Sequence, residues 1–571
     1  MSITYRSGRT VCDTMEVNSS MAASGFQLQE VALCAFLWVW LRLSTNYQDI
    51  LLAITAFISF RYAWVVFRYR LARRRFHNCD QVVDQVPPTY PYIIPFLGNA
   101  ITITWDTALF TRLATYYKGK STSTRVSMLG SAVYFIQDRS AVLKLIQLSD
   151  SPTPFAIRFI SPAKALFGLL EDCGLDTYRI SRLHFEDFIQ TFLGPGQEST
   201  TLRFLKSIKT RLGRLIPDTH EWGDLDDLFV FTSRVVSASV IETIFGPTPL
   251  RLHSDFVTNL WEYDNGVPWL LRMVPRWLYP QPHRARERVL EQIQAWSRYA
   301  HQGSVDMMEN GKQNDKAIST HDLGWIWEAA TNPASAAALA ILHIYSDPEL
   351  LIRVRAELKE QIPHSSPSEW LDSKQLKNLP LLSSIYAETM RLYSNAYLMV
   401  ASPPNTDVSL GKWKFPRRSL GLVSSSLAHT DDNFWNTKDD LYPIDTFWAD
   451  RFLVYPNDPT SGPIKPEIRA AMTNERPRKE RVENGNKGAP YFSTNDLEGS
   501  YMPFGAGSDK CPGRFLAKDV IMVACALLVG EYDVEILAEP LKYNIDMDPW
   551  RFGLGIGQPK FRIAARIRRR R

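Results

Sequence analysis

The chain has 571 residues, more than one simple core normally holds, which predicts either two domains or one large helical domain. Hydrophobic residues make up 45% of it, enough for a buried core, and the mild net charge of +5 argues against a nucleic-acid partner. The 6 cysteines are scattered and lack the spacing of a zinc site or a disulfide framework, which indicates a reducing compartment for most of the chain.

An apolar stretch near the N-terminus predicts a membrane anchor. Residues 50–67 read ILLAITAFISFRYAWVVF, close to the minimum for a helix that crosses a bilayer core of about 30 Å. The arginines that follow, between positions 68 and 75, are typical of the cytoplasmic side. We therefore expect residues 1–49 to be lumenal or interfacial and residues 50–67 to span the membrane. A shorter apolar piece at 31–41 leaves open whether there are one or two membrane segments, and a buried globular helix is the alternative for either piece.

Residues 68–95 are first basic and then rich in proline, which predicts a hinge. Pro87, Pro88, Pro91 and Pro95 prevent a regular helix and stiffen the chain. Such a segment after a membrane span would hold a globular body at a fixed angle to the bilayer. We expect residues 96–571 to form that body as one catalytic domain.

Helical periodicity dominates the body of the chain. Residues 341–362 and 381–393 place apolar side chains three and four positions apart, which is typical of amphipathic helices. Short strand-like pieces appear late, at SLGLVSSS (419–426) and KFRIAARI (560–567). The composition of residues 459–500 predicts an extended surface loop. The sequence therefore predicts a fold that is mainly α with small β-sheets.

The stretch FGAGSDKCPGRF, residues 504–515, predicts a cofactor ligand. A thiolate suits haem iron, zinc or an iron–sulfur cluster, and the last two need several ligands, whereas no other cysteine lies near Cys511 in the sequence. Three glycines let the backbone approach a flat ring. Pro512 fits the first turn of a helix whose N-terminal N–H groups would face the sulfur and favour its charged form. An inert buried cysteine in a turn is the alternative.

This arrangement resembles the haem-binding loop of the cytochrome P450 family, in which Phe, Gly, Cys and Gly are separated by two, three and one residues. The matching residues are Phe504, Gly507, Cys511 and Gly513. The resemblance implies haem b as the cofactor, with the Cys511 thiolate as the axial ligand of its iron. Electron donation from that thiolate favours cleavage of the O–O bond. The order of span, basic cluster, proline segment and later motifs extends the resemblance over nearly the whole chain.

The loop departs from the family at one position. Members usually carry a basic residue two positions before the cysteine, where it contacts a haem propionate, and this chain has Asp509. The resemblance then implies that Lys510 or Arg514 supplies the positive charge.

A second motif lies in AETMRL, which places Glu388 and Arg391 three residues apart on one helix face. Taken alone, such a pair is an exposed ion pair of little energetic value. In the family it joins an arginine from a later segment in a buried network, and FWADRF offers Arg451 at that place. Because buried charges persist only when they satisfy one another, the resemblance implies that losing one partner costs about 3–5 kcal/mol.

The central helix departs from the family more strongly. Most members have an acidic residue followed by threonine over the haem for proton delivery to dioxygen, and AATNPAS has Asn332 and Pro333 there. Proline removes the hydrogen bond to the carbonyl of Ala329 and costs about 3 kcal/mol. The resulting kink would open a groove in which Thr331, Asn332 or Ser335 holds a water. A kinked core helix without such a role is the alternative.

This proline, YMPFGAG before the cysteine and RFGLGIGQP at 551–559 are similar to one branch of the family. The branch contains the sterol 7α-hydroxylases, the sterol 12α-hydroxylases and prostacyclin synthase. Because prostacyclin synthase is an isomerase that needs neither external electrons nor dioxygen, an isomerase or dehydratase of the same fold is the first alternative to a monooxygenase. A non-catalytic haem protein is the second.

The resemblance implies a monooxygenase of the endoplasmic reticulum membrane with a cytosolic catalytic domain. Its substrate would be a bulky apolar molecule such as a steroid or terpenoid, with secondary metabolism as the expected context. Electrons would come from NADPH through an NADPH–cytochrome P450 reductase, because no dinucleotide-binding glycine pattern is visible. The family's haem-contacting helix is expected to include Tyr178, Arg179 and Arg182.

Overall fold

The computed structural model describes twelve stretches of the chain: residues 45–78, 85–94, 96–117, 120–149, 165–168, 195–300, 311–361, 379–411, 413–475, 488–507, 510–537 and 545–570. Two compact units contain them, Met1–Arg74 with Pro91–Ile93, and Arg75–Tyr90 with Ile94–Arg571. Cys12, Cys34, Cys79, Cys173, Pro95, Asp509 and the predicted helix around Tyr178 lie outside the described residues.

The first unit is built on one long helix, α2 (Thr45–Asn78). Residues Tyr47–Arg74 are long and apolar enough to cross a membrane, and none of their most apolar window is buried. The helix continues beyond the predicted span of 50–67 at both ends, and the residues added after position 67 include several arginines, which are good helix formers. Arg61 donates a hydrogen bond to the carbonyl of Ile93 at 2.7 Å and lies 5.2 Å from the ring of Tyr92. The limits of the membrane span and of the hinge stay predictions.

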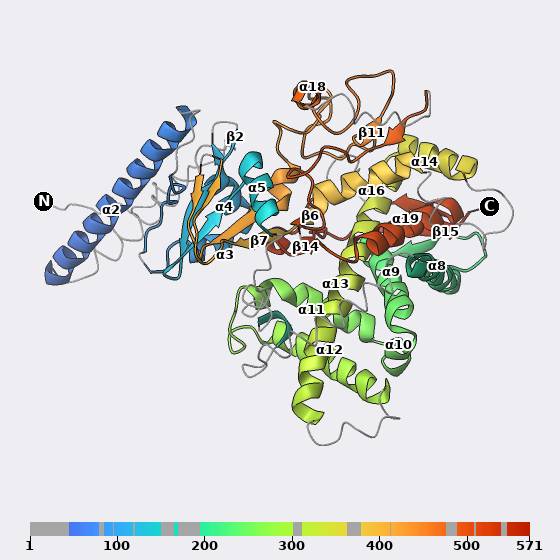
Figure 1. Ribbon diagram of the computed structural model, residues 1–571. Helices are drawn as coiled ribbons and strands as arrows, with labels where there is room; N and C mark the ends of the chain where they lie inside the picture. The colour runs from blue at the N-terminus through green and yellow to red at the C-terminus, as the bar shows by residue number, and fades with distance from the viewer. Residues whose placement is uncertain are drawn as a thin grey trace, which may run out of the picture. The chain divides into compact units, whose positions relative to one another are not determined.

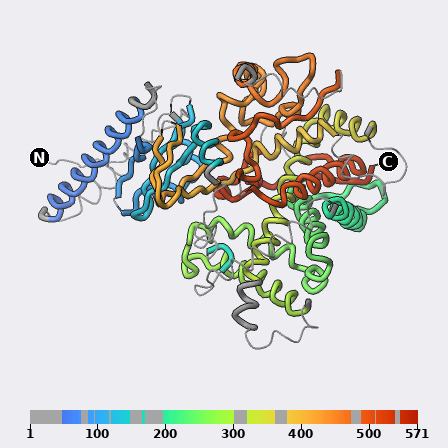
Figure 2. Tube along the Cα trace, viewed as in Figure 1, coloured from blue at the N-terminus to red at the C-terminus, as the bar shows by residue number. Residues whose placement is uncertain are grey.

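One end of the second unit is a four-stranded sheet of segments that are far apart in sequence. Its order is β3 (Thr124–Met128), β4 (Ser131–Phe135), β10 (Leu420–Ser424) and β7 (Tyr397–Ala401). The pair β4–β10 is parallel and the other two pairs are antiparallel. In Figure 2 the blue and orange segments lie side by side in this sheet. Beside it lie α3 (Ala100–Trp105), α4 (Thr107–Thr115) and α5 (Arg139–Ser149).

A helical body makes up the rest of the second unit, with α13 (Gly311–Ser346) running through its middle (Figure 1). Around α13 pack α9 (Leu228–Phe245), α11 (Phe256–Leu271), α12 (Pro280–Ala300), α16 (Pro380–Tyr393) and α19 (Arg514–Glu531). α8 (Pro195–Leu215) packs on α9 and α19. These helices share the largest hydrophobic core.

Short elements complete the described structure. The helices are α10 (Thr248–Leu252), α14 (Pro348–Gln361), α17 (Ser425–His429), α18 (Pro466–Glu475) and η4 (Pro549–Arg551). Within the described residues, four two-stranded sheets pair β1 (Tyr116–Tyr117) with β2 (Lys120–Ser121), β8 (Val408–Leu410) with β9 (Trp413–Phe415), β11 (Leu453–Val454) with β12 (Tyr491–Phe492), and β14 (Gly555–Ile556) with β6 (Ser394–Asn395). In a three-stranded sheet, β15 (Ala565–Arg569) lies between β13 (Tyr532–Ile536) and β5 (Gly223–Leu225) and pairs with both. The predicted class, mainly α with small sheets, is confirmed.

Two local predictions were wrong. The helix expected over 341–362 is two helices, because α13 ends at Ser346 and the Asp347 side chain caps α14 by accepting from the backbone of Glu349 at 3.0 Å. The loop expected over 459–500 contains α18 and β12 in its described part. The sequence did not indicate α18 or β12, because both elements have polar, exposed faces.

Candidate functional site

The cysteine loop is folded back on itself by backbone hydrogen bonds. The N–H of Cys511 donates to the carbonyl of Phe504 at 2.8 Å, and the N–H of Lys510 donates to that of Gly507 at 3.3 Å. Gly505 and Gly507 have φ angles of +76° and +62°, a region that favours glycine. The loop therefore depends on these glycines for its shape, and it presents the Cys511 side chain at the start of α19.

The N-terminus of α19 points at the sulfur, as predicted, but the thiol is not acidic. Burial and, to a smaller extent, the charge of Glu328 raise the pKa of Cys511 to about 11, although hydrogen bonds from the N–H groups of Gly513 and Arg514 act to lower it. The N–H groups lower the pKa of the thiol, as predicted, but burial outweighs them and the net pKa is raised. A bound cation would deprotonate such a thiol outright, so this sulfur fits a metal centre better than a free nucleophile.

A haem fits this site and a multi-ligand metal does not. Within the described residues, no group of three or more His, Cys, Asp or Glu side chains is arranged to hold a metal ion. Cys511 is exposed, and a Cβ placed on Gly513 would stand 3.9 Å from its sulfur. One accessible thiolate beside bare backbone suits a flat macrocycle that needs a single protein ligand. Arg514, a candidate partner of a propionate, donates to the Cys511 carbonyl at 3.0 Å and lies 4.3 Å from the Phe515 ring.

Glu388, Arg391 and Arg451 form a buried network in which none of the three side chains reaches solvent. Both oxygens of Glu388 accept from Arg391, at 2.7 and 2.8 Å, and from Arg451, at 3.0 and 3.1 Å. Burial alone would raise the pKa of Glu388, but the two guanidinium groups outweigh it and hold that pKa below its usual range. Burial lowers the pKa of Arg451 to about 10, so this guanidinium group stays charged at neutral pH.

Backbone carbonyls satisfy the remaining guanidinium N–H groups. Arg391 donates to the carbonyls of His429 at 2.8 Å and Ile444 at 2.9 Å. Arg451 donates to the carbonyl of Asn436 and to that of Thr446. The network therefore ties α16 to the segment between residues 429 and 451, as an internal cross-link rather than a surface ion pair.

His429 connects this network to the cysteine loop. Its carbonyl accepts from Arg391, and its Nε2 accepts from the backbone N–H of Met502 at 2.9 Å. Burial and the neighbouring Arg391 charge lower the pKa of His429 to about 3, so the ring is neutral and available as an acceptor. Ser394, at the end of α16, also donates to the carbonyl of Pro503 at 3.1 Å. The segment that leads into the loop is thus positioned from α16.

Pro333 lies within α13, and nearby side chains donate hydrogen bonds to backbone carbonyls of the residues before it. Ser237 of α9 donates to the carbonyl of Ala330 at 2.8 Å and accepts from the indole N–H of Trp261 at 3.1 Å. Thr331 is buried and donates to the carbonyl of Trp327 at 2.7 Å. The hydroxyl of Thr331 therefore already donates its hydrogen to the helix backbone. Its role in holding a water stays a prediction.

Asn332 is joined to the C-terminal segment. Its Oδ1 accepts from the N–H of Ile556 in β14 at 3.0 Å. A Cβ on Gly555, whose φ is +99°, would stand 2.4 Å from the same oxygen. This contact and the positive φ together favour glycine at 555, and the amide N–H₂ of Asn332 stays available for the predicted water.

A polar junction centred on Asp264 of α11 was not predicted from the sequence. Its carboxylate accepts from Trp327 of α13 at 2.7 Å, from Gln558 at 2.7 Å, and from Arg551 at 2.8 Å. All of these side chains are buried. The stretch RFGLGIGQP, noted above for its resemblance, supplies Arg551 and Gln558 and thereby clamps the C-terminal segment to α11 and α13.

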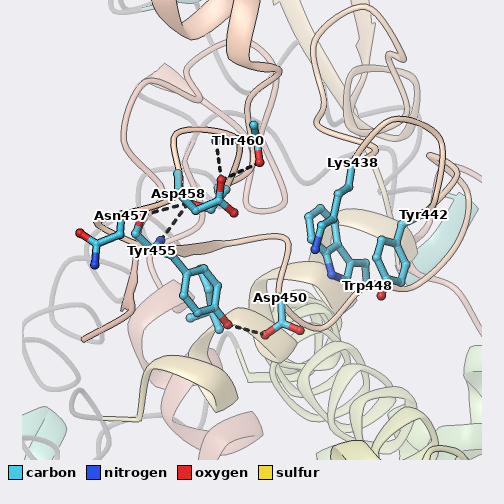
Figure 3. Close-up of a pocket in the computed structure, with 11 residues that line it drawn as sticks. Lys438, Tyr442, Trp448, Asp450, Tyr455, Asn457, Asp458 and Thr460 are labelled. Atoms are coloured by element: carbon cyan, nitrogen blue, oxygen red, sulfur yellow. Dashed lines mark hydrogen bonds between the residues drawn. The ribbon is translucent and has the colours of Figure 1, made fainter. Parts of the chain in front are cut away.

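A pocket of about 420 Å³ lies elsewhere on the second unit (Figure 3). Its walls include Tyr442 stacked on Trp448 at 4.8 Å, and Asp450, which accepts from the hydroxyl of Tyr455 at 3.3 Å. None of its lining residues belongs to α13 or to the cysteine loop. We therefore do not assign substrate to this pocket.

One accessible cysteine at a helix start, a glycine-shaped loop and a buried Glu–Arg–Arg network are together typical of haem-thiolate enzymes. The model of the cytochrome P450 family matches residues 88–443, more than half of the chain. The chain therefore belongs to the cytochrome P450 family, with the fold of that family, and is an oxidoreductase of the monooxygenase class. The family's cofactor is a haem with a thiolate ligand.

Curated relatives agree with this assignment. Cytochrome P450 monooxygenase efuG of Hormonema carpetanum is 29% identical over 526 residues, which cover 85% of this chain and 90% of that protein. Cytochrome P450 monooxygenase fsoE of Humicola fuscoatra is 26% identical, with 85% and 88% covered. Cholesterol 7-alpha-monooxygenase of Cricetulus griseus is 22% identical, with 83% and 91% covered. The predicted similarity to the sterol 7α-hydroxylase branch is confirmed.

Proposed function

We propose that Cys511 ligates the iron of haem b, and that the enzyme inserts one oxygen atom from O₂ into a bulky apolar steroid or terpenoid. The observation that carries this is the accessible Cys511 sulfur at the N-terminus of α19, with two backbone N–H groups directed at it. The name of the Cricetulus griseus relative, cholesterol 7-alpha-monooxygenase, supports a sterol-like substrate, and secondary metabolism is our expected context.

When bound, the haem would supply the activation of dioxygen. The chain's own residues would hold the haem in place and shape the loop around it. Phe504, Gly507 and Gly513 shape the loop, and Arg514 or Lys510 would offer positive charge to a propionate. Glu388, Arg391 and Arg451 keep the loop's supporting segments in place. The overall reaction consumes substrate, O₂, NADPH and one proton, and yields hydroxylated substrate, water and NADP⁺. NADPH–cytochrome P450 reductase is the proposed electron donor.

We place the enzyme in the endoplasmic reticulum membrane, with residues 50–67 as the span, 1–49 lumenal or interfacial, 68–95 as the hinge and 96–571 as the cytosolic catalytic domain. Exposed apolar side chains of the second unit support contact with a lipid surface. Trp105 is 82% exposed and Trp277 is 83% exposed. Arg272 donates to the carbonyl of Thr104 at 3.1 Å, which brings these two segments together.

The test is turnover under isotopically labelled dioxygen. Purified enzyme, reductase and NADPH are incubated with a panel of steroids and terpenoids, and products are analysed by mass spectrometry. We expect one labelled oxygen atom in the product and no product without NADPH. Unlabelled product, formed without NADPH and O₂, would favour the isomerase or dehydratase instead. The observation that supports this second candidate is the presence of Asn332 and Pro333 where most family members have an acidic residue and threonine.

A further inference from the structure

Arg61 is the single charged residue inside the predicted membrane span, and it has a partner within the first unit. Its guanidinium group donates a hydrogen bond to the backbone carbonyl of Ile93 at 2.7 Å and lies 5.2 Å from the ring centroid of Tyr92. Both residues belong to Pro91–Ile93, the short segment that the first unit contains besides its N-terminal stretch. An arginine inside a bilayer is costly unless it pairs with a group such as a backbone carbonyl, and Ile93 provides one.

The segment Pro91–Ile93 and α2 both carry apolar surface that stays accessible. The side chain of Ile93 is 54% exposed, although its backbone carbonyl is bound to Arg61. On α2, Trp64 and Phe67 are exposed as well, and their rings stack at 6.0 Å. Pro91 has no backbone N–H, so the segment brings one polar group fewer into an apolar environment. Apolar side chains that are exposed on a candidate membrane helix and on the segment bound to it fit one continuous contact with lipid.

The hydrogen bond also sets the depth at which the segment would lie. Arg61 lies six residues before Phe67, the end of the proposed span. Six residues correspond to about 9 Å along an α-helix. Interfacial segments bury their apolar face about 5–10 Å into the boundary between headgroups and acyl chains. Tyrosine is typical of this level because its ring is apolar and its hydroxyl is polar, and Tyr92 is a tyrosine beside Arg61.

We propose that Pro91–Ile93 inserts into the cytosolic leaflet beside α2, where Arg61 holds it, as a second element of the membrane anchor. The partner is the lipid bilayer, with acyl chains around Ile93 and headgroups around the hydroxyl of Tyr92. This rests on the proposed function for the membrane span itself. Because the residues on both sides of the segment, Tyr90 and Ile94, belong to the second unit, the chain connects that unit to the inserted segment at both of its ends.

The test measures depth in the bilayer and needs no substrate. An environment-sensitive fluorescent amino acid is placed at position 93 of the full-length holoenzyme in phosphatidylcholine vesicles. The vesicles carry a nitroxide quencher on the headgroup, near the top of the acyl chain or at its end. We expect the strongest quenching at position 93 from the nitroxide near the top of the acyl chain. The same probe at position 92 replaces it if the substitution at 93 prevents haem incorporation.

Two further probe positions calibrate this measurement. Phe57 is exposed inside the proposed span, so a probe at position 57 should be quenched most by the nitroxide at the chain end. Leu441 is an exposed apolar residue that follows Lys438, Asp439 and Asp440, so a probe at position 441 should stay unquenched. Quenching at 57 but none at 93 would overturn this proposal. Absence of quenching at 57 would contradict the proposed span itself.

Variants test whether Arg61 holds the segment in place. R61L removes the donor, and we expect the quenching at position 93 to be lost while that at position 57 stays. R61K keeps a donor and should retain it. R68L, which removes an exposed arginine of the same helix, is the matched control and should behave as wild type. Unchanged quenching at position 93 in R61L would show that Arg61 does not hold the segment, which contradicts the proposal.

Discussion

Glu388 accepts hydrogen bonds from two arginines although none of its atoms reaches solvent. E388Q removes the negative charge and leaves two buried guanidinium groups uncompensated. We expect it to lower the free energy of unfolding by about 3–5 kcal/mol in denaturant titrations. The control is E535Q, which breaks the exposed pair with Arg566 and should cost less than about 1 kcal/mol. Equal effects of the two changes would show that the network contributes no more than a surface ion pair.

Two buried histidines should make stability fall in acid. Burial lowers the pKa of both His343 and His429 from 6.5 to about 3. Below pH 6.5 the unfolded chain binds protons that the folded chain does not, so their contribution is complete above pH 6.5 and is lost progressively toward pH 3. The expected loss is about 1.4 kcal/mol per pH unit for each histidine.

The measurement is the urea midpoint between pH 7 and pH 5, in wild type and in H343Q. His343 contacts the Tyr393 hydroxyl at 2.6 Å and stacks on Phe447 at 3.9 Å, so the variant is less stable at pH 7. Its pH dependence should nevertheless be shallower than that of wild type. Parallel slopes for the two proteins would rule out His343 as a source of acid sensitivity.

At the scale of elements, α13 and β14 are joined by one hydrogen bond from Ile556 to Asn332. N332A leaves a partly buried backbone N–H without its acceptor and should cost about 1–3 kcal/mol. N332D keeps an oxygen at the same place and is the matched control, expected to stay within about 1 kcal/mol of wild type. Thermal unfolding of the three proteins checks this. If N332A is as stable as N332D, the contact does not hold the two elements together.

The elements also show what the sequence can and cannot predict. Gly507, Cys511 and Gly513 are close in sequence, as are Glu388 and Arg391, so their spacing draws attention to them, but their roles were assigned through the family resemblance. Arg451 was found only through the family resemblance.

The junctions of Asp264 with Arg551 and of Asn332 with Ile556 join segments more than 200 residues apart. No periodicity in a single sequence indicates such pairs.

At the scale of the whole molecule, the hydrophobic cores lie within the second unit and α2 contributes no residue to them. We therefore expect a protein that begins at residue 75 to fold and bind haem. It should be released from membranes more readily than the full chain by high salt or mild detergent. Its control is the W105S/W277S variant of the same shortened protein, which should bind vesicles more weakly still. A shortened protein that cannot bind haem would show that α2 is needed for folding.

The central claim is that the Cys511 sulfur is the protein ligand of the haem iron. The most direct measurement is the absorption spectrum of the reduced protein under carbon monoxide, for wild type and C511S. We predict a long-wavelength Soret band for wild type, because thiolate donation shifts it, and its loss in C511S even where haem is retained. A C511S protein that keeps this band would contradict the account.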